Sequence, residues 1–214
     1  MNLPKISSNN LNIPGLLKLE NFITRDEECN ILNEVYKNDW QTSIKRRVQH
    51  YGNTFDYNTL KLNDIKCSNF PTWLNMIILR ITKLDCCKNF NPDQCTINEY
   101  LPGIGIAQHI DTHSCFTDTI ISLSLENDIV MQFKNKNNNT EEKQSLYLPA
   151  RSLLILQKES RYCYAHSIAY RKTDVDPNNK LVKRGKRVSI TLRQTNNIGC
   201  RCKWHNLCDS RMSH

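Results

Sequence analysis

The feature that most constrains the fold is a change of hydrophobic period near residue 95. Before it, two segments have the apolar spacing of amphipathic helices, whereas after it short segments alternate apolar and polar residues, as half-buried strands do. Two helices followed by a run of short strands predict an α+β fold with a jelly-roll (double-stranded β-helix) core and the helices packed on one sheet. The six strand-like segments are "CTINEYL", "TIISLSL", "DIVMQF", "QSLYLP", "SLLILQ" and "RVSITLRQ".

The two predicted helices carry recognisable start signals. Thr24 followed by Glu27 is a capping-box pattern, and apolar residues at helical spacing follow it. The segment "PTWLNMIILRITKL" (71–84) is predicted as the second helix, with Pro71 near its first turn. No repeat and no second domain are evident. We therefore expect a loose segment at 1–13, a folded domain at 14–199 and a short cysteine-containing tail at 200–214.

The charge balance favours a polyanionic partner. Lys and Arg number 29 against 21 Asp and Glu, a net charge of +8, which suits nucleic acid but also fits an ordinary lysine-rich surface. The first fifteen residues contain no apolar signal core, and no apolar run is long enough for a membrane, so we expect a chain without a membrane partner, in the cytoplasm or nucleus. A basic stretch, "TDVDPNNKLVKRGK" (173–186), is predicted to be a long loop that acts as a lid or contacts substrate.

The motif "QHIDTH" places three metal-ligand types at alternate positions: His109, Asp111 and His113. Alternate side chains of an extended chain share a face, so all three could reach one ion. Two histidines and a carboxylate form the facial triad of non-haem Fe(II) oxygenases, which leaves positions open for O₂ and a co-substrate. A distant His166, after "SLLILQ", supplies another histidine. A zinc hydrolase is disfavoured, since no HExxH helix is present.

Two arginines near the end of the chain suggest how a dicarboxylate co-substrate is held. Arg187 and Arg193 are six residues apart, so both side chains leave the same face of a strand. A guanidinium matches a carboxylate in bidentate fashion. Six strand steps span roughly 20 Å, however, so both arginines reach one small acid only if the strand curves.

Several ordered motifs resemble the AlkB-type Fe(II)/2-oxoglutarate dioxygenases: "INEYLPGIGIAQHIDTH", "ISLSLENDIVMQF", "ESRYCYAHSI" and "KRVSITLR". The resemblance implies that His109, Asp111 and His166 hold Fe(II), with O₂ and 2-oxoglutarate as co-substrates. It further implies 2-oxoglutarate contacts from Asn98, Glu99, Tyr100, Arg187 and Arg193. Strand alternation puts Asn98 and Tyr100 on one face and Glu99 on the other, so a contact from Glu99 would come from its backbone.

The family typically oxidises a nucleobase or its side group, which must leave its stack to reach the metal. The segment "RRVQHYGNTFDYN" (46–58) offers a mixture of cations for phosphate and aromatic rings for stacking. The predicted substrate residues are Arg46, Arg47, Tyr51 and Tyr57.

Two further features resemble the AlkB branch that hydroxylates the modified wobble uridine of tRNA. Repair demethylases of the family typically have an acid at the position of His113, and the tail here contains "CRCKWHNLC". In the hydroxylase branch a structural zinc takes the equivalent histidine and three cysteines. The resemblance thus implies a zinc site at His113, Cys200, Cys202 and Cys208, with His205 as the competing fourth ligand.

Three functions are therefore considered. The first is hydroxylation of 5-methoxycarbonylmethyluridine in tRNA; the second is oxidative demethylation of alkylated DNA or RNA; the third is a catalytically silent RNA- or protein-binding module. The resembled animal enzyme adds an RNA-recognition domain and a methyltransferase domain, which this sequence does not contain. We expect tRNA to be the partner, together with a separate tRNA methyltransferase that makes the ester.

Overall fold

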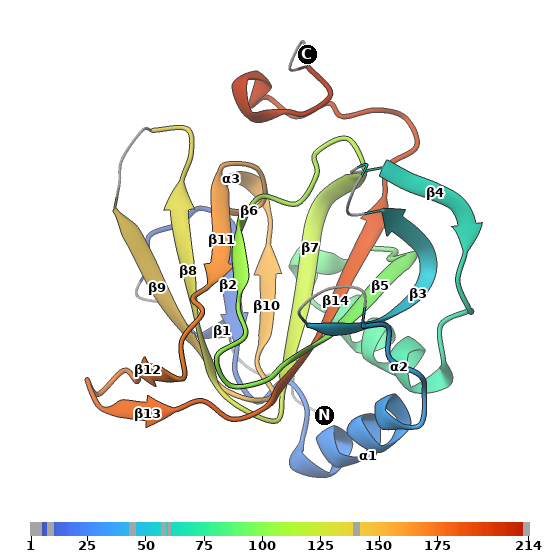
Figure 1. Cartoon of the computed structure of the whole chain (residues 1–214). Helices are drawn as coiled ribbons and strands as arrows, with labels where there is room; N and C mark the ends of the chain where they lie inside the picture. Colours follow the sequence, from blue (N-terminus) through green and yellow to red (C-terminus); the bar gives the residue numbers. More distant parts are fainter. Residues whose placement is uncertain are drawn as a thin grey trace.

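The computed structural model describes residues 6–7, 11–42, 46–56, 59, 61–138 and 142–211, and it consists mostly of antiparallel strands with few helices (Figure 1). An eight-stranded sheet and a four-stranded sheet form its centre. The large sheet runs in the order β1 (Ile6–Ser7), β2 (Leu16–Leu19), β10 (Leu153–Leu156), β7 (Phe116–Leu125), β14 (Arg187–Thr195), β5 (Gln94–Tyr100), β3 (Arg47–Asp56) and β4 (Lys61–Lys66). The small sheet runs in the order β6 (Ile106–His109), β11 (Tyr164–Ile168), β8 (Ile129–Asn135) and β9 (Lys143–Leu148).

The large sheet buries both faces, and strand alternation sorts its side chains between them. On β7, Ile121 and Leu123 enter the hydrophobic core that lies under the helices, whereas Ile120 packs on the opposite side. On that opposite side, Ile120 and Leu154 share a second core with Met131 of the small sheet. The two sheets therefore pack face to face, as the predicted jelly roll requires.

Two helices cover the outer face of the large sheet. α1 (Arg25–Tyr36) begins with the predicted capping box, in which Thr24 and Glu27 exchange side-chain and backbone hydrogen bonds. α2 (Thr72–Ile81) presents Leu74, Ile77 and Ile81 to the core. The described residues contain no helix long and apolar enough to cross a membrane.

All six segments with a period of two are strands, which confirms that part of the sequence prediction. Two other segments differ from their predicted roles. The segment 46–58, predicted to contact substrate, is largely the ten-residue strand β3, which pairs with β5 inside the large sheet. The basic stretch at 173–186 is an antiparallel hairpin of β12 (Thr173–Val175) and β13 (Leu181–Lys183), not an open loop.

Arg184 explains why the hairpin is ordered. Its guanidinium is buried and bonds both carboxylate oxygens of Asp174, at 2.6 and 2.8 Å. The chain then continues through β14 to a tail that lies across one end of the sheets (Figure 1). That tail contains one short 3₁₀ turn, His205–Leu207.

Candidate active site

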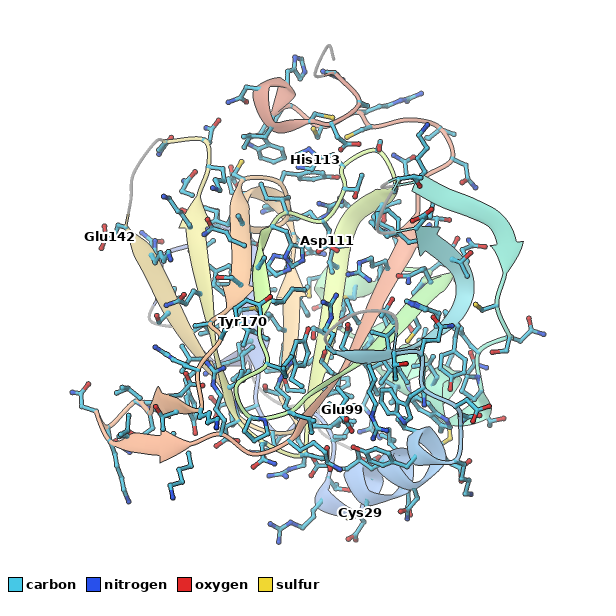
Figure 2. The ribbon with its side chains drawn as sticks, viewed as in Figure 1. Cys29, Glu99, Asp111, His113, Glu142 and Tyr170 are labelled. Atoms are coloured by element: carbon cyan, nitrogen blue, oxygen red, sulfur yellow. The ribbon has the colours of Figure 1, made fainter. Side chains whose placement is uncertain are left out.

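A cavity of about 370 Å³ lies between the two sheets, and most of its wall is apolar. Six polar side chains carry the chemistry at this cavity, three of them candidate metal ligands and three of them arginines. Figure 2 shows Asp111 between the sheets, with His113 beyond it beneath the tail and Glu99 nearer α1. The six are His109, Asp111, His166, Arg46, Arg187 and Arg193.

The three candidate iron ligands come together through one strand pair. His109 is the last residue of β6, and it is the direct partner of His166 on β11, with ring centroids 4.4 Å apart. Asp111 lies two residues beyond β6, and its Oδ2 is 3.7 Å from Nε2 of His166. One ligand atom from each residue lies within 4.8 Å of the others. The geometry fits a facial set around a single ion.

The hydrogen bonding of His109 and the protonation state of His166 also suit a metal. Nδ1 of His109 donates to the carbonyl oxygen of Ala107 at 2.8 Å, which leaves Nε2 as the ring nitrogen available to a metal. Burial lowers the pKa of His166 to about 3. His166 is therefore neutral at neutral pH, which is the form that binds a cation.

Asp111 is ionised and oriented by Arg193. Burial acts to raise the pKa of Asp111, but the positive charges of Arg193 and Arg161 act against it, and the pKa lies well below its ordinary value. Nε and Nη2 of Arg193 both approach Oδ1, at 2.8 and 2.7 Å. Oδ2 is thus left on the side of His166, where a metal would take it.

Arg187 is the residue that fits a co-substrate carboxylate. It is 1% exposed, its Nη2 donates to Ser124 at 2.9 Å, and its Nε has no hydrogen-bond partner among the described residues. Burial lowers the pKa of Arg187 to about 10. A buried guanidinium without a carboxylate is costly, so its position in the cavity wall fits an anionic ligand such as 2-oxoglutarate.

Arg193 faces the same cavity, as its six-residue spacing from Arg187 predicts, but it is already engaged. Besides Asp111, it donates to the side chain of Gln94 at 3.1 Å. The structure therefore places Arg193 against a candidate metal ligand. Ser124 and Gln94 had no distinguishing sequence signal, because a serine and a glutamine in a strand are ordinary residues.

Strand alternation on β5 sorts the other predicted co-substrate residues. Asn98 and Tyr100 line the cavity, whereas Glu99 points to the other face, as predicted. There its carboxylate accepts from Arg47 at 2.6 and 2.9 Å and from the Tyr36 hydroxyl at 3.0 Å. The Glu99 side chain is therefore committed to an ion pair outside the cavity.

The predicted substrate residues do not form one group. Arg46 lines the cavity and donates to Asn98 at 2.9 Å, but Arg47 lies on the opposite face with Glu99 and above the Trp40 ring. The prediction for Tyr51 was wrong, because its ring is 7% exposed within the core under the helices and cannot stack on a base. Tyr57 lies outside the described residues.

A second cluster lies just beyond the first. One ligand atom from each of four residues lies within 4.8 Å of the others, and Nδ1 of His113 is 3.5 Å from Sγ of Cys202. Burial lowers the pKa of His113 to about 4, so this imidazole is also neutral. His205 is exposed and takes no part, so the structure favours His113 as the fourth member. The four are His113, Cys200, Cys202 and Cys208.

A family model of the 2OG-Fe(II) oxygenase superfamily matches residues 15–193. The chain belongs to this superfamily. It is 38% identical to the Arabidopsis thaliana "Alkylated DNA repair protein ALKBH8 homolog", over 94% of this chain and 64% of that protein. It is also 38% identical to the Mus musculus "tRNA (carboxymethyluridine(34)-5-O)-methyltransferase ALKBH8", over 92% of this chain and 32% of that protein.

Two more distant proteins also match this chain. A Caenorhabditis elegans protein named "DNA N6-methyl adenine demethylase" is 27% identical over 86% of this chain and 61% of its own length. The solved structure of OsALKBH1 superposes with a TM-score of 0.63 at 18% identity, covering 87% of this chain and 99% of that one, which shows the shared fold. The chain thus spans from a third to about two thirds of the length of these curated relatives.

These findings identify an AlkB-like dioxygenase, an oxidoreductase whose family uses Fe(II), 2-oxoglutarate and O₂. Bound together in such a site, iron and 2-oxoglutarate activate O₂ for the oxidation of a carbon–hydrogen bond. The ligand trio in the cavity wall fits this chemistry, and so does Arg187, which has no carboxylate partner among the described residues.

Proposed function

We propose that this dioxygenase hydroxylates the 5-methoxycarbonylmethyl side chain of wobble uridine in tRNA. In this proposal His109, Asp111 and His166 hold Fe(II). Arg187 binds the far carboxylate of 2-oxoglutarate, with Asn98 and Tyr100 lining its pocket. The similarity to the mouse protein, whose name specifies carboxymethyluridine at position 34 of tRNA, supports this substrate class.

The position of His113 is the observation that carries the substrate assignment. Methylated bases that repair enzymes accept are often cationic, and a carboxylate beside the metal favours them. Here His113 occupies the position where such an acid would be expected, and its imidazole lies with the three cysteines. Among the described residues that line the cavity, Asp111 is the sole carboxylate, and Arg193 already neutralises it.

The charge of the cavity also supports an uncharged substrate group. Arg46 at the cavity wall uses Nε to hold Asn98, which leaves its terminal nitrogens for a second acceptor. An ester side chain offers a carbonyl oxygen and carries no charge, so a guanidinium suits it better than it suits a cationic base. We infer that Arg46 orients the uridine side chain, while the apolar walls exclude water.

We also propose a structural zinc at His113, Cys200, Cys202 and Cys208. Three cysteines and one histidine are a usual ligand set for a closed tetrahedral site. Three of the four side chains are buried, and Cys200 is half-buried. The tail contains little apolar material of its own, so a metal is a reasonable means of fixing it.

A direct assay tests the function. Purified protein is incubated with Fe(II), 2-oxoglutarate and tRNA that carries the unhydroxylated ester, and the nucleosides are analysed by mass spectrometry. The expected result is a gain of one oxygen atom on the wobble nucleoside, absent in Asp111→Ala. An unmodified wobble nucleoside, in a preparation that still releases succinate from 2-oxoglutarate, would contradict the proposal.

Oxidative demethylation of DNA or RNA is the alternative, and the nematode demethylase among the relatives favours it. Demethylation uses the same oxidation, after which the hydroxylated methyl group leaves as formaldehyde. Formaldehyde release from methylated oligonucleotides, without a hydroxylated wobble nucleoside, would select this alternative. A catalytically silent binding module would give neither product.

A tRNA partner also fits the exposed cations of the β12–β13 hairpin. Lys180 and Lys183 are exposed at this hairpin, where they are available to phosphate. Arg184 is not, because it is buried against Asp174. We further propose that a separate methyltransferase supplies the ester substrate.

A further inference from the structure

Arg161 is a buried arginine whose charge has no ion-pair partner among the described residues. It lies on the short helix α3 (Lys158–Tyr162) and is 2% exposed. Its guanidinium makes four hydrogen bonds, and every acceptor is a backbone carbonyl. The acceptors are those of Asp111 at 2.7 Å, Thr112 at 3.0 Å, Phe116 at 3.2 Å and Thr117 at 3.1 Å.

All four carbonyls belong to one segment, residues 111–117, which joins β6 to the start of β7. The segment begins with an iron-ligand candidate, Asp111, and carries the tail-facing His113 two residues later. No strand pairing includes residues 111–114 in the described structure, and backbone pairing resumes at Cys115, whose carbonyl accepts from the Asn196 amide at 2.8 Å. The backbone between the two clusters is therefore fixed mainly by side chains.

A second side chain, from the tail, binds other backbone groups of the same segment. Oδ1 of Asp209, in the tail, accepts the backbone N–H groups of His113 at 2.7 Å and Ser114 at 3.1 Å, and its Oδ2 accepts the Ser114 hydroxyl. Arg161 thus binds the carbonyls of the segment while Asp209 binds its amides. The tail and α3 together determine where Asp111 and His113 point.

Only a guanidinium can make this set of contacts. Its planar fork carries five N–H donors and reaches four acceptors at once, whereas an ammonium has three donors on a single nitrogen. Burial lowers the pKa of Arg161, and the nearby negative charge of Asp111 acts in the opposite direction. Carbonyl dipoles replace the water that the buried charge has lost.

We propose that Arg161 is a positioning residue that fixes segment 111–117, so that Asp111 faces the iron site while His113 faces the three cysteines. The two metal sites are thereby coupled through one backbone segment. This inference rests on the metal assignments of the proposed function and is independent of the substrate that the enzyme oxidises.

The test compares Arg161→Lys with Arg184→Lys, since Arg184 is also a buried arginine but bonds the Asp174 carboxylate away from the cavity. Fe(II) affinity is measured without oxygen in the presence of 2-oxoglutarate, alongside zinc content and the thermal midpoint. Loss of groups that orient metal ligands typically weakens binding about 10–100-fold, and we expect an increase of about tenfold or more in the Fe(II) Kd of Arg161→Lys. Zinc retention should fall in the same variant. Arg184→Lys should lower the thermal midpoint and leave both metals unchanged.

A milder variant keeps the proposal testable if Arg161→Lys does not fold. Asp209→Asn weakens the contact to the backbone amides of His113 and Ser114. Because Asp209 is on the exposed tail, this variant should shift Fe(II) affinity in the same direction by a smaller factor. Unchanged Fe(II) affinity in a folded Arg161→Lys, or in Asp209→Asn if the first variant is unfolded, would overturn the proposal. Asp111→Ala distinguishes failure of the Arg161 proposal from failure of the iron assignment. If it too leaves Fe(II) affinity unchanged, the iron assignment itself is wrong.

Discussion

The two ligand clusters both take residues from the segment 109–113, but they are built differently. The His109, Asp111 and His166 trio has three members, borders a cavity and depends on the pairing of β6 with β11. The His113 cluster has four members, and its three cysteines come from the tail, which contains no strand between residues 200 and 211. Three ligands beside a cavity are typical of a catalytic metal, and four ligands in a closed set are typical of a structural one.

The difference shows that alternate spacing does not assign a metal. His109, Asp111 and His113 follow one another at the same interval, yet β6 ends at His109. Beyond that point the backbone no longer follows a strand, so the face of each side chain depends on other contacts. Arg161 and Asp209 supply those contacts, and they turn His113 away from the iron ligands.

The largest expected effect comes from breaking the trio. Asp111→Ala removes the carboxylate ligand, so 2-oxoglutarate-dependent succinate release should fall below detection while zinc content stays unchanged. Succinate release and metal content of the same preparation measure both. Turnover that persists in Asp111→Ala would show that the trio does not hold the catalytic metal.

Breaking the tail cluster should affect stability first. His113→Ala should lower zinc content and reduce the thermal midpoint by roughly 5–10 °C, because 1 kcal/mol corresponds to about 2–4 °C in a chain of this size. His205→Ala is the matched control and should change neither quantity, since His205 is exposed and outside the cluster. Zinc lost from His205→Ala and retained in His113→Ala would reverse the assignment.

The two cavity arginines, Arg187 and Arg193, are expected to affect different ligands of the iron site. Arg187→Lys loses the bidentate fork, and a charged hydrogen bond contributes about 1.5–3 kcal/mol, so the KM for 2-oxoglutarate should rise about tenfold or more. Arg193→Lys should instead weaken Fe(II) binding, because Arg193 holds Asp111. Initial rates at varied 2-oxoglutarate and anaerobic Fe(II) titrations distinguish the two. The opposite pattern would exchange their roles.

The smallest effect should come from the hairpin, which is remote from both clusters. Replacing Lys180 and Lys183 with alanine should weaken tRNA binding by a few-fold and reduce the slope of log Kd against log salt by about one per lost phosphate contact. Fe(II) and zinc content should not change. A salt slope equal to that of the unaltered protein would exclude this hairpin from the tRNA interface.

Much of this organisation could be predicted from sequence, because it depends on local patterns. The period of two identified six strands, and the Thr24–Glu27 capping box identified the start of α1. β3 was missed since its strand carries polar and charged residues at both faces. Its burial depends on the helices and on β5, which are distant in sequence.

The predictions for some individual side chains were wrong for the same reason. Tyr51 was grouped with substrate residues because an aromatic ring stood in a basic segment, yet α1 and α2 cover its face of the sheet. Arg184 belongs to the basic stretch predicted to contact substrate, but the fold of the hairpin brings the Asp174 carboxylate against it. His113 was the predicted fourth ligand and His205 its local competitor, and the fold of the tail favours His113.

The direct pairing of His109 with His166 has a consequence for how chain length can vary. A strand changes faces at every residue, so one deletion between α3 and His166 would turn that imidazole out of the cavity. The tip of the β12–β13 hairpin, residues 176–180, carries no such constraint and can lengthen without disturbing a ligand. Insertions and deletions should therefore be absent just before His166 and frequent at the hairpin tip.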